Sequence, residues 1–359
     1  MKTFVTRTSL PPFEEYCEQI RPLWESHMLT NMGQQHAEFT ASLEQMLGCR
    51  VTLFSHGHLA LEAVLRSLDL RPGCKIVTSP FTFVSTVHAI VRLGFEPVFC
   101  DVLECDGTMD PAALERLMGH DVGAILPVHV YGNVCDVDAI GDIARRWHVP
   151  VVYDAAHAFG VNYRGKSVVQ YGDASVLSFH ATKVFSTVEG GAVCCGEGPM
   201  VQALKDERNF GIRDEQVCAA PGGNGKMNEL QAAMGICNLR HFPEALAKRR
   251  ALAELYMTRL DGSVSFFTQR DGADGNCSYM PVLLESARRR DALADALDRE
   301  GIHARKYFWP LACDALCYKQ LPADVPVARN LSERVLALPL YEELKEEEVE
   351  RICRVVLAL

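Results

Sequence analysis

The run GAILPVHVYGNVCDVDAIGDIARRWHVPVVYD, residues 123–154, holds two apolar segments on either side of a helical pattern. The segments 124–128 and 149–153 are continuously apolar, which is typical of strands that are covered on both faces. Residues 137–147 form the helical pattern between them. A strand, a helix and a second strand in this order predict a βαβ unit of a parallel sheet.

The same alternation continues on both sides of this run. Helices are expected at 59–68, 85–93 and 111–118, and strands at 75–79, 96–101, 174–179 and 191–195. Strands separated by helices of this length predict a large α/β domain with a mainly parallel sheet, which we place at residues 1–245 together with an N-terminal helical segment.

The pattern changes from about residue 248. A helix is expected at 243–260, followed by a strand at 278–284 and by helices at 288–300 and 345–357. The sequence therefore predicts a smaller C-terminal α+β domain, residues 246–359, joined to the first through the long helix.

Composition excludes several classes of protein. The 359 residues carry a formal net charge of -10, which argues against a general binder of nucleic acid or of a membrane surface. No apolar run approaches the ~20 residues that span a bilayer, and residues 1–12 lack the apolar core of a secretory signal. The fourteen cysteines include no CxxC pair with zinc spacing, so we expect reduced thiols in a cytoplasmic protein without a metal site.

Lys183 follows the strand expected at 174–179, in the run VLSFHATK. In open α/β sheets, ligands bind at the carboxyl ends of the strands. A lysine held there in apolar surroundings tends to have a lowered pKa and can act as an amine nucleophile. A surface lysine that opens a loop explains this run at least as well.

Two more positions suggest a cofactor that carries a phosphate. Asp154 ends an apolar strand, where its carboxylate could pair with the protonated ring nitrogen of a pyridine cofactor; a helix N-cap fits equally well. Gly57, in FSHGHLALE, opens a helix whose free N–H groups and dipole favour an anion, although an ordinary helix start is also common.

Seven segments in order along nearly the whole chain resemble the motifs of one family. They are LTNMG (29–33), SPFTFVST (79–86), PVHVYG (127–132), DAAHAFG (154–160), SFHATK (178–183), GNGKMNELQAA (223–233) and SERVLALP (332–339). The family is the DegT/DnrJ/EryC1/StrS aminotransferases, the sugar-nucleotide branch of the fold type I pyridoxal-phosphate enzymes. The resemblance implies a mostly parallel seven-stranded sheet between helices and pyridoxal 5′-phosphate as the cofactor.

The resemblance also implies a role for each matching residue. Lys183 would carry the cofactor covalently and shuttle the proton, and Asp154 would hold the pyridine nitrogen. Asn224 would reach the phosphate of the neighbouring subunit, so the active sites would be shared within a homodimer. The other implied contacts are Phe83 on the ring, Gly57, His58 and Ser178 at the phosphate, and His157 near the phenolic oxygen.

Four positions differ from the residues that are usual in the family. His58 stands in place of threonine, which leaves the backbone contact to phosphate, and His157 in place of glutamine keeps a donor with another geometry. Lys226 replaces arginine and loses its planar fork, and Ser186 replaces asparagine. Some relatives with histidine in place of the catalytic lysine are dehydratases rather than aminotransferases, and Lys183 argues against that chemistry.

The implied reaction transfers an amino group from L-glutamate to the cofactor and then to a keto sugar on a nucleoside diphosphate. The run HATKVFSTVEGG, residues 180–191, is similar to members that act at sugar C-4. We therefore expect a dTDP-4-keto-6-deoxyhexose to become a dTDP-4-amino-4,6-dideoxy sugar, for O-antigen lipopolysaccharide, another glycan or a secondary metabolite. The alternatives are amination at C-3, a pyridoxal-phosphate dehydratase or lyase, and a non-catalytic ligand-binding regulator.

Five residues are candidate contacts to the substrate. Glu189 would lie near the sugar, and His129 would line the pocket; a solvated turn carboxylate and a satisfied strand-end histidine are the alternatives. Arg305, Lys306 and Tyr307 match a family stretch near the substrate mouth and would meet the diphosphate, or else form a solvated charge run.

Overall fold

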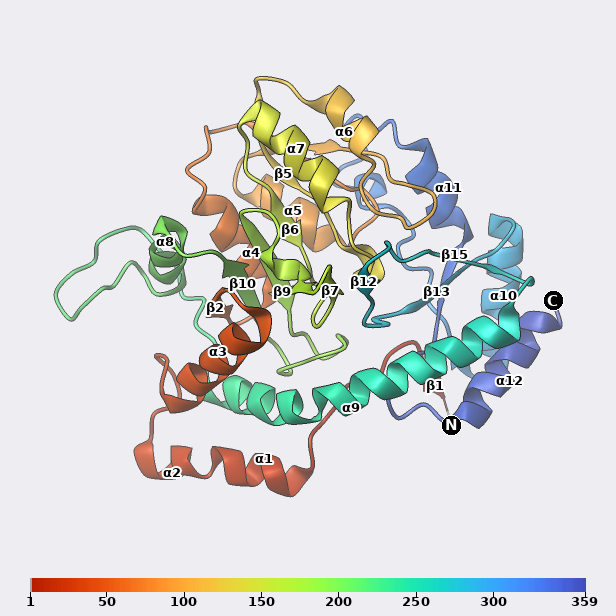
Figure 1. Cartoon of the computed structure of the whole chain (residues 1–359), viewed down its shortest axis with the longest axis horizontal. Helices are drawn as coiled ribbons and strands as arrows, with labels where there is room; N and C mark the ends of the chain where they lie inside the picture. Colours follow the sequence, from red (N-terminus) through yellow and green to blue (C-terminus); the bar gives the residue numbers. More distant parts are fainter. Residues whose placement is uncertain (1) are drawn as a thin grey trace.

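The computed structural model describes residues 2–359, and its largest feature is a sheet near the centre of the molecule (Figure 1). The sheet has a four-stranded and a three-stranded part. Parallel bridges from Ile125 to Val151 and from Val128 to Asp154 join its two halves. Of the seven strands, β10 runs antiparallel to its neighbours, so the expected mostly parallel seven-stranded sheet is confirmed. The order is β2 (Arg50–Phe54), β10 (Gly191–Cys195), β9 (Ala174–Ser178), β6 (Val152–Asp154), β5 (Val122–Leu126), β3 (Lys75–Thr78) and β4 (Glu96–Phe99).

Helices cover both faces of this sheet. Because successive side chains of a strand point to opposite faces, Ala124 and Leu126 of β5 join one core and Ile125 joins the other. The first core is covered by α4 (Gly57–Arg66), α5 (Val84–Arg92) and α8 (Pro199–Arg208). The second is covered by α3 (Gln34–Leu47), α6 (Pro111–Leu117), α7 (Val137–Trp147) and the first turns of α9 (Glu229–Leu260). The sheet is thus buried on both sides, as its apolar strands require.

Helix α9 runs lengthwise below the sheet and connects the two halves of the molecule (Figure 1). Asn228 caps it and exchanges hydrogen bonds with Gln231 in a capping box. The sequence-based start of this helix at residue 243 was wrong. Proline is common in the first turn of a helix, which suggested a start there, but Pro243 lies inside α9.

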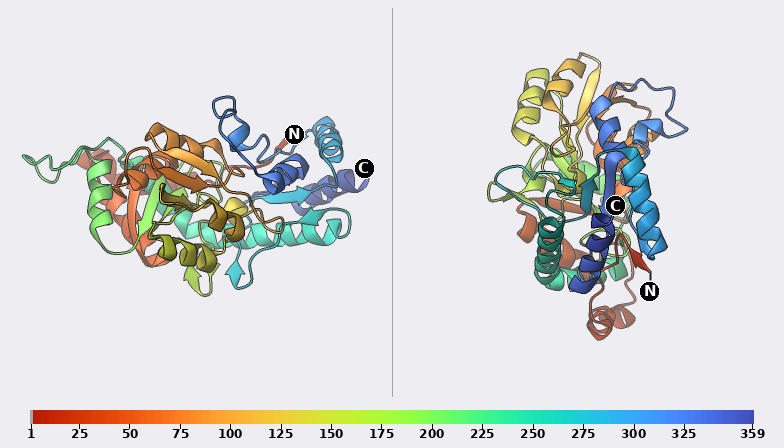
Figure 2. Two further views of the ribbon diagram at one scale, coloured as in Figure 1. Left: turned by 90° about the horizontal axis from the view of Figure 1, so that it is seen from above. Right: turned by 90° about the vertical axis from the view of Figure 1, so that its right-hand side faces the viewer.

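The C-terminal half has its own core. Strand β13 (Met280–Leu283) pairs antiparallel with β11 (Ser265–Phe266) and β15 (Val335–Leu338). Helices α10 (Ala287–Arg299) and α12 (Glu346–Leu357) and the end of α9 pack against these strands (Figure 2). The smaller α+β unit is confirmed, whereas the boundary between residues 245 and 246 stays a prediction because it falls within α9.

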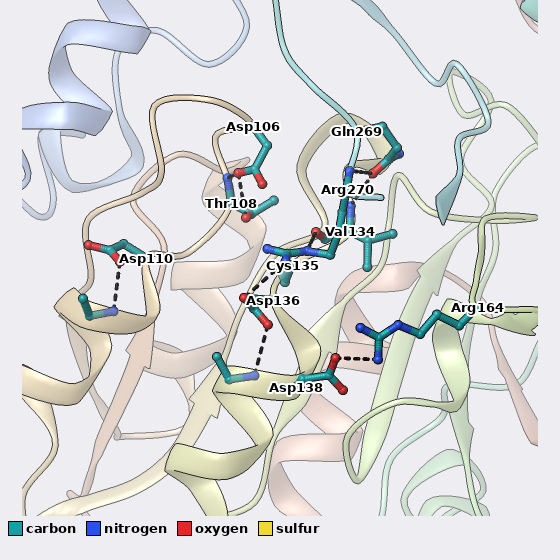
Figure 3. Close-up of polar contacts among 12 residues, drawn as sticks. Asp106, Thr108, Asp110, Val134, Cys135, Asp136, Asp138, Arg164, Gln269 and Arg270 are labelled. Atoms are coloured by element: carbon teal, nitrogen blue, oxygen red, sulfur yellow. Dashed lines mark hydrogen bonds and ion pairs between the residues drawn. The ribbon is translucent and has the colours of Figure 1, made fainter. Parts of the chain in front are cut away.

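A loop of the C-terminal half is held against the segment that leads into α7 (Figure 3). Gln269 Oε1 accepts from the N–H of Val134 at 3.0 Å, and Arg270 donates to the Val134 carbonyl and to Asp136, both at 3.2 Å. Asp136 also caps α7 by accepting from the N–H of Ala139 at 3.1 Å. These contacts hold the C-terminal half against the edge where the sheet's strands end.

The remaining elements are short, and some of them, such as η1, are buried. They are β1 (Thr3–Phe4), α1 (Phe13–Ile20), α2 (Pro22–Ser26), η1 (Val130–Gly132), β7 (Asn162–Tyr163), β8 (Lys166–Ser167), η2 (Val168–Gln170), β12 (Ala273–Asp274), β14 (Ile302–His303), η3 (Ala312–Asp314) and α11 (Pro326–Arg334). Within residues 2–359, no helix has both the length and the hydrophobicity to cross a bilayer.

Candidate functional site

A cavity of about 540 Å³ lies where β6 and β9 end and where α4 and α5 begin. The C-terminal half contributes the segment 305–307 to its wall. Most of the residues singled out in the sequence meet here, namely Gly57, His58, Phe83, Asp154, His157, Ser178, Lys183, Glu189, Arg305 and Tyr307. In the described part of the chain, no group of three or more His, Cys, Asp or Glu side chains is arranged to hold a metal ion.

Lys183 lies half-buried in the loop that follows β9. Burial lowers the pKa of its amine to about 8. The negative charge of Asp154 opposes this shift, and the positive charge of Arg305 adds to it. About a tenth of this amine is therefore unprotonated at pH 7, far more than for an ordinary lysine. Its surroundings suit a nucleophile and a proton carrier rather than a surface lysine.

Asp154 is buried at the end of β6 and is held by two donors. Its Oδ2 accepts from the hydroxyl of Thr86 at 2.7 Å, and its Oδ1 accepts from the N–H of Ala156 at 3.1 Å. Burial raises the pKa of this carboxyl, while both hydrogen bonds and the charge of Lys183 lower it. No α-helix starts at this point of the described chain, so the carboxylate closes a turn rather than capping a helix.

His157 presents an N–H group to the cavity. Its Nδ1 accepts from the N–H of Tyr131 at 3.1 Å, and burial, followed by the charge of Lys183, keeps its pKa well below the usual range. The ring is therefore neutral, and the hydrogen bond assigns its proton to Nε2. A neutral donor is what the glutamine usual at this position would also supply.

One end of the cavity suits a phosphate group. Gly57 begins α4, and His56 caps the helix by accepting from the N–H of Leu59 at 3.3 Å. A Cβ at Gly57 would lie 3.0 Å from the Cβ of Ser178, so glycine lets the helix start come close to β9. The free N–H groups of the first turn and the Ser178 hydroxyl then face the same space, which favours an anion.

Two side chains stand at the accessible rim of the cavity. Phe83, immediately before α5, has 51% of its surface exposed although it is aromatic, so one face of the ring is free to stack on a flat ligand. Glu189 lies 3.6 Å from His180 Nε2, and it follows Val188, whose φ of 71° is uncommon for a β-branched residue.

Three of the predicted residues do not line the cavity. His129 is fully buried, stacks on Tyr153 at 4.6 Å and accepts from the N–H of Cys135 at 3.1 Å, so it packs in the core, although its Nε2 has no partner and the alternative of a satisfied histidine holds only in part. Lys306 pairs with Asp291 at 2.6 Å. Asn224 lies beyond the cavity wall, at the base of the arm between α8 and α9, and its contact with a neighbouring subunit stays a prediction.

Sequence reasoning did not single out several residues of the wall. Thr82, Ser85 and Thr86 were part of the quoted motif SPFTFVST, so their place beside Phe83 at a helix start was the available signal. His56 and Thr182 likewise adjoin residues that were named. Neighbours in sequence at a strand end or helix start are the first places to look for missing contacts.

This chain resembles known proteins over nearly its whole length. The model of the DegT/DnrJ/EryC1/StrS aminotransferase family matches residues 13–357. The dTDP-4-amino-4,6-dideoxy-D-glucose transaminase of Shigella dysenteriae is 38% identical, covering 97% of this chain and 96% of the relative. The protein of the same name from Escherichia coli is 35% identical, covering 98% and 97%.

The fold has close counterparts among solved structures. The structure of DesI in the presence of its TDP-sugar product superimposes with a TM-score of 0.93 at 28% identity, covering 99% of this chain and 92% of the other. Together with the family match over residues 13–357, this shows that the chain belongs to the DegT/DnrJ/EryC1/StrS aminotransferase family.

Proposed function

We propose that this protein is a pyridoxal-5′-phosphate-dependent aminotransferase that uses Lys183 to hold the cofactor. The observation that carries the proposal is the meeting, in one cavity, of an amine with a pKa near 8 and a buried carboxylate in a chain of this family. When bound, the cofactor supplies an electron sink that makes the α-hydrogen of an amino donor acidic.

The residues of the cavity fit this group one by one. Asp154 would face the pyridine nitrogen, Phe83 the ring and His157 the phenolic oxygen, while Gly57 and Ser178 would bind the phosphate. Lys183, once released from the cofactor, would carry the proton between the substrate carbon and the cofactor. A pKa close to the working pH suits an amine that must act first as base and then as acid.

We infer that the amino donor is L-glutamate and the acceptor a dTDP-4-keto-6-deoxyhexose. Support comes from the two transaminase relatives and from the run 180–191. Arg305 and Tyr307 line the cavity and are available to the diphosphate, and Glu189 is available to a sugar hydroxyl. Lys306 is the weaker candidate because it pairs with Asp291.

The active form is proposed to be a homodimer with shared active sites. The arm between α8 and α9 extends away from the body of the molecule (Figures 1 and 2). It exposes Phe210, Ile212 and Val217, which a partner subunit would cover, and Asn224 lies at its base. All fourteen cysteines are free thiols, which supports a cytoplasmic location.

The test combines the cofactor with a panel of substrates. The wild type and Lys183→Ala would each be incubated with L-glutamate and with 3-keto and 4-keto nucleotide sugars, and the products identified by mass spectrometry. We expect the wild type to aminate the 4-keto dTDP sugar and to yield 2-oxoglutarate, and the variant to do neither. Turnover by Lys183→Ala would overturn the role of Lys183. Water loss without amination would favour a dehydratase, amination of the 3-keto sugar alone would move the reaction to C-3, and binding without turnover would favour a regulator.

A further inference from the structure

His58 lies between a buried carboxylate and a hydroxyl group that faces the cavity. Its Nε2 is 3.3 Å from Oε1 of Glu62, and its Nδ1 is 2.8 Å from Oγ of Ser85. His58 and Ser85 both line the cavity, whereas Glu62 is buried behind them. The three side chains therefore form a connected row from the core to the phosphate end of the cavity.

Two arginines lie against Glu62 at the inner end of this row. Arg92 Nε donates to Oε1 of Glu62 at 2.6 Å, and Arg66 lies 3.8 Å from Oε2. A carboxylate accepts hydrogen bonds but donates none, so the nitrogen of His58 that faces Glu62 is the one that carries a proton.

The protonation state of His58 decides whether the Ser85 hydroxyl can donate a hydrogen bond to a ligand in the cavity. In the neutral ring the proton is on Nε2, so Nδ1 accepts the Ser85 hydroxyl hydrogen and only lone pairs of Ser85 face the cavity. In the doubly protonated ring Nδ1 donates to Ser85 Oγ, and the hydroxyl hydrogen is free to point into the cavity. A phosphate accepts hydrogen bonds only from the second arrangement.

We propose that binding of the cofactor phosphate is coupled to uptake of one proton by His58, which converts Ser85 into a hydrogen-bond donor to that phosphate. The inference rests on the proposed cofactor site and concerns two residues that the family comparison left without a side-chain role. The balance is simple: a proton from solvent adds to Nδ1, and no other bond is made or broken.

The surroundings of His58 set the state of the free site. Burial lowers the pKa of His58, and the charges of His56, Arg92 and His88 lower it further, while Glu62 raises it. The ring of His56 stacks near that of His58, with centroids 6.5 Å apart. Without an anion the ring is thus mostly neutral at neutral pH. A bound dianion adds the negative charge that makes the cation favourable.

The experiment uses the full chain freed of cofactor, with pyridoxine 5′-phosphate as the probe because it has the phosphate but no aldehyde to react with Lys183. Titration calorimetry in buffers of different ionisation enthalpy measures the protons taken up on binding. We expect the wild type to take up more protons than His58→Thr between about pH 6 and pH 8, with affinity falling by up to about tenfold per pH unit as pH rises. The titration of the phosphate itself is common to both proteins and cancels in the comparison.

Three variants sharpen the result. Glu62→Gln should reduce the uptake, and Ser85→Ala should weaken binding by about tenfold. His241→Thr is the matched control, since His241 is exposed and also pairs with a glutamate, Glu15, at 2.6 Å; its uptake should equal that of the wild type. If His58→Thr does not fold, as judged by circular dichroism, Ser85→Ala decides alone.

The outcomes separate this inference from the proposed function. Equal proton uptake by the wild type and His58→Thr would overturn the proposed protonation of His58. Unchanged binding by Ser85→Ala would overturn the proposed hydrogen bond from Ser85 to the phosphate. Absence of saturable binding of pyridoxine 5′-phosphate to the wild type would instead overturn the proposed cofactor site.

Discussion

Thr86, in the first turn of α5, donates its hydroxyl hydrogen to Oδ2 of Asp154 over 2.7 Å. Its oxygen lies 2.8 Å from that of Thr82, so the hydroxyl is held on both sides. Thr86 is also three residues beyond Phe83. One helix start therefore places both the ring that faces the cavity and the donor that holds the buried carboxylate.

Thr86→Val is expected to destabilise the protein in a pH-dependent way. Burial raises the folded-state pKa of Asp154, so the free energy of unfolding falls as pH rises from the ordinary 3.8 to the raised value. Removing the hydroxyl takes away a bond to the charged form, which should lower the free energy of unfolding by about 1–3 kcal/mol at neutral pH and by less in acid. Urea unfolding of the wild type and Thr86→Val, at neutral pH and in acid, would measure this loss in the free energy of unfolding. An equal loss at both would show that packing, not the hydrogen bond, is responsible.

The amine of Lys183 should react at unusually low pH. In the cofactor-free chain, half of this amine is unprotonated near pH 8 rather than near the ordinary 10.5. Since the folded pKa is the lower one, the free energy of unfolding should also rise with pH between these two values. Acylation followed by peptide mass spectrometry would give the rate at Lys183 against pH, with exposed lysines as internal references. A midpoint shared with those lysines would contradict the lowered pKa.

His157→Gln should bind the cofactor more tightly than His157→Leu. Glutamine can accept from the N–H of Tyr131 and still offer a donor to the cavity, as the neutral ring does. Leucine leaves that buried N–H unpaired, at a cost of about 1–3 kcal/mol in the free energy of unfolding, and removes the donor. Cofactor affinity and urea unfolding would be measured for both variants. Equal cofactor affinity in the two would mean that the N–H of His157 does not contact the ligand.

Glu229 joins two motifs that are far apart in sequence. Its buried carboxylate accepts from the N–H of Gly33 at 2.8 Å and from that of Gln35 at 2.7 Å, at the start of α3. Glu229→Gln turns one acceptor into a donor that faces an N–H group, and we expect a loss of about 1–3 kcal/mol in the free energy of unfolding. Glu254→Gln, at an exposed position of the same helix, is the control and should change little. A similar effect of both substitutions would show that the contact with α3 contributes nothing.

Local patterns predicted six of the seven strands of the sheet, whereas the edge strand β2 and helix α8 were not predicted. The apolar run at 149–153 leads into β6, because a strand buried on both faces is apolar at successive residues. The helix at 137–147 has the expected bounds, because its apolar stripe recurs at helical spacing. Pro243 misled the prediction, because its local preference for a first turn was overridden by packing along α9.

Contacts between distant elements were harder to predict. Lys183 and Asp154 could be placed together because both follow strands of a parallel sheet. His129 also lies near a strand end, but its ring turns onto Tyr153 instead of into the cavity. The row from Glu62 to Ser85 joins the helices α4 and α5. The hydrophobic periodicity of a sequence does not predict the angle at which two helices pack.

Helix α9 has a mechanical consequence. Its first turns pack in the core of the sheet and its last turns in the core of the C-terminal half, so the two halves share one rod of about 48 Å. The C-terminal half carries Arg305 and Tyr307 over the cavity, and a rotation that lifts them must bend this rod. Pro243, the proline inside α9, has no N–H for the preceding turn, so the bending stiffness is lowest there.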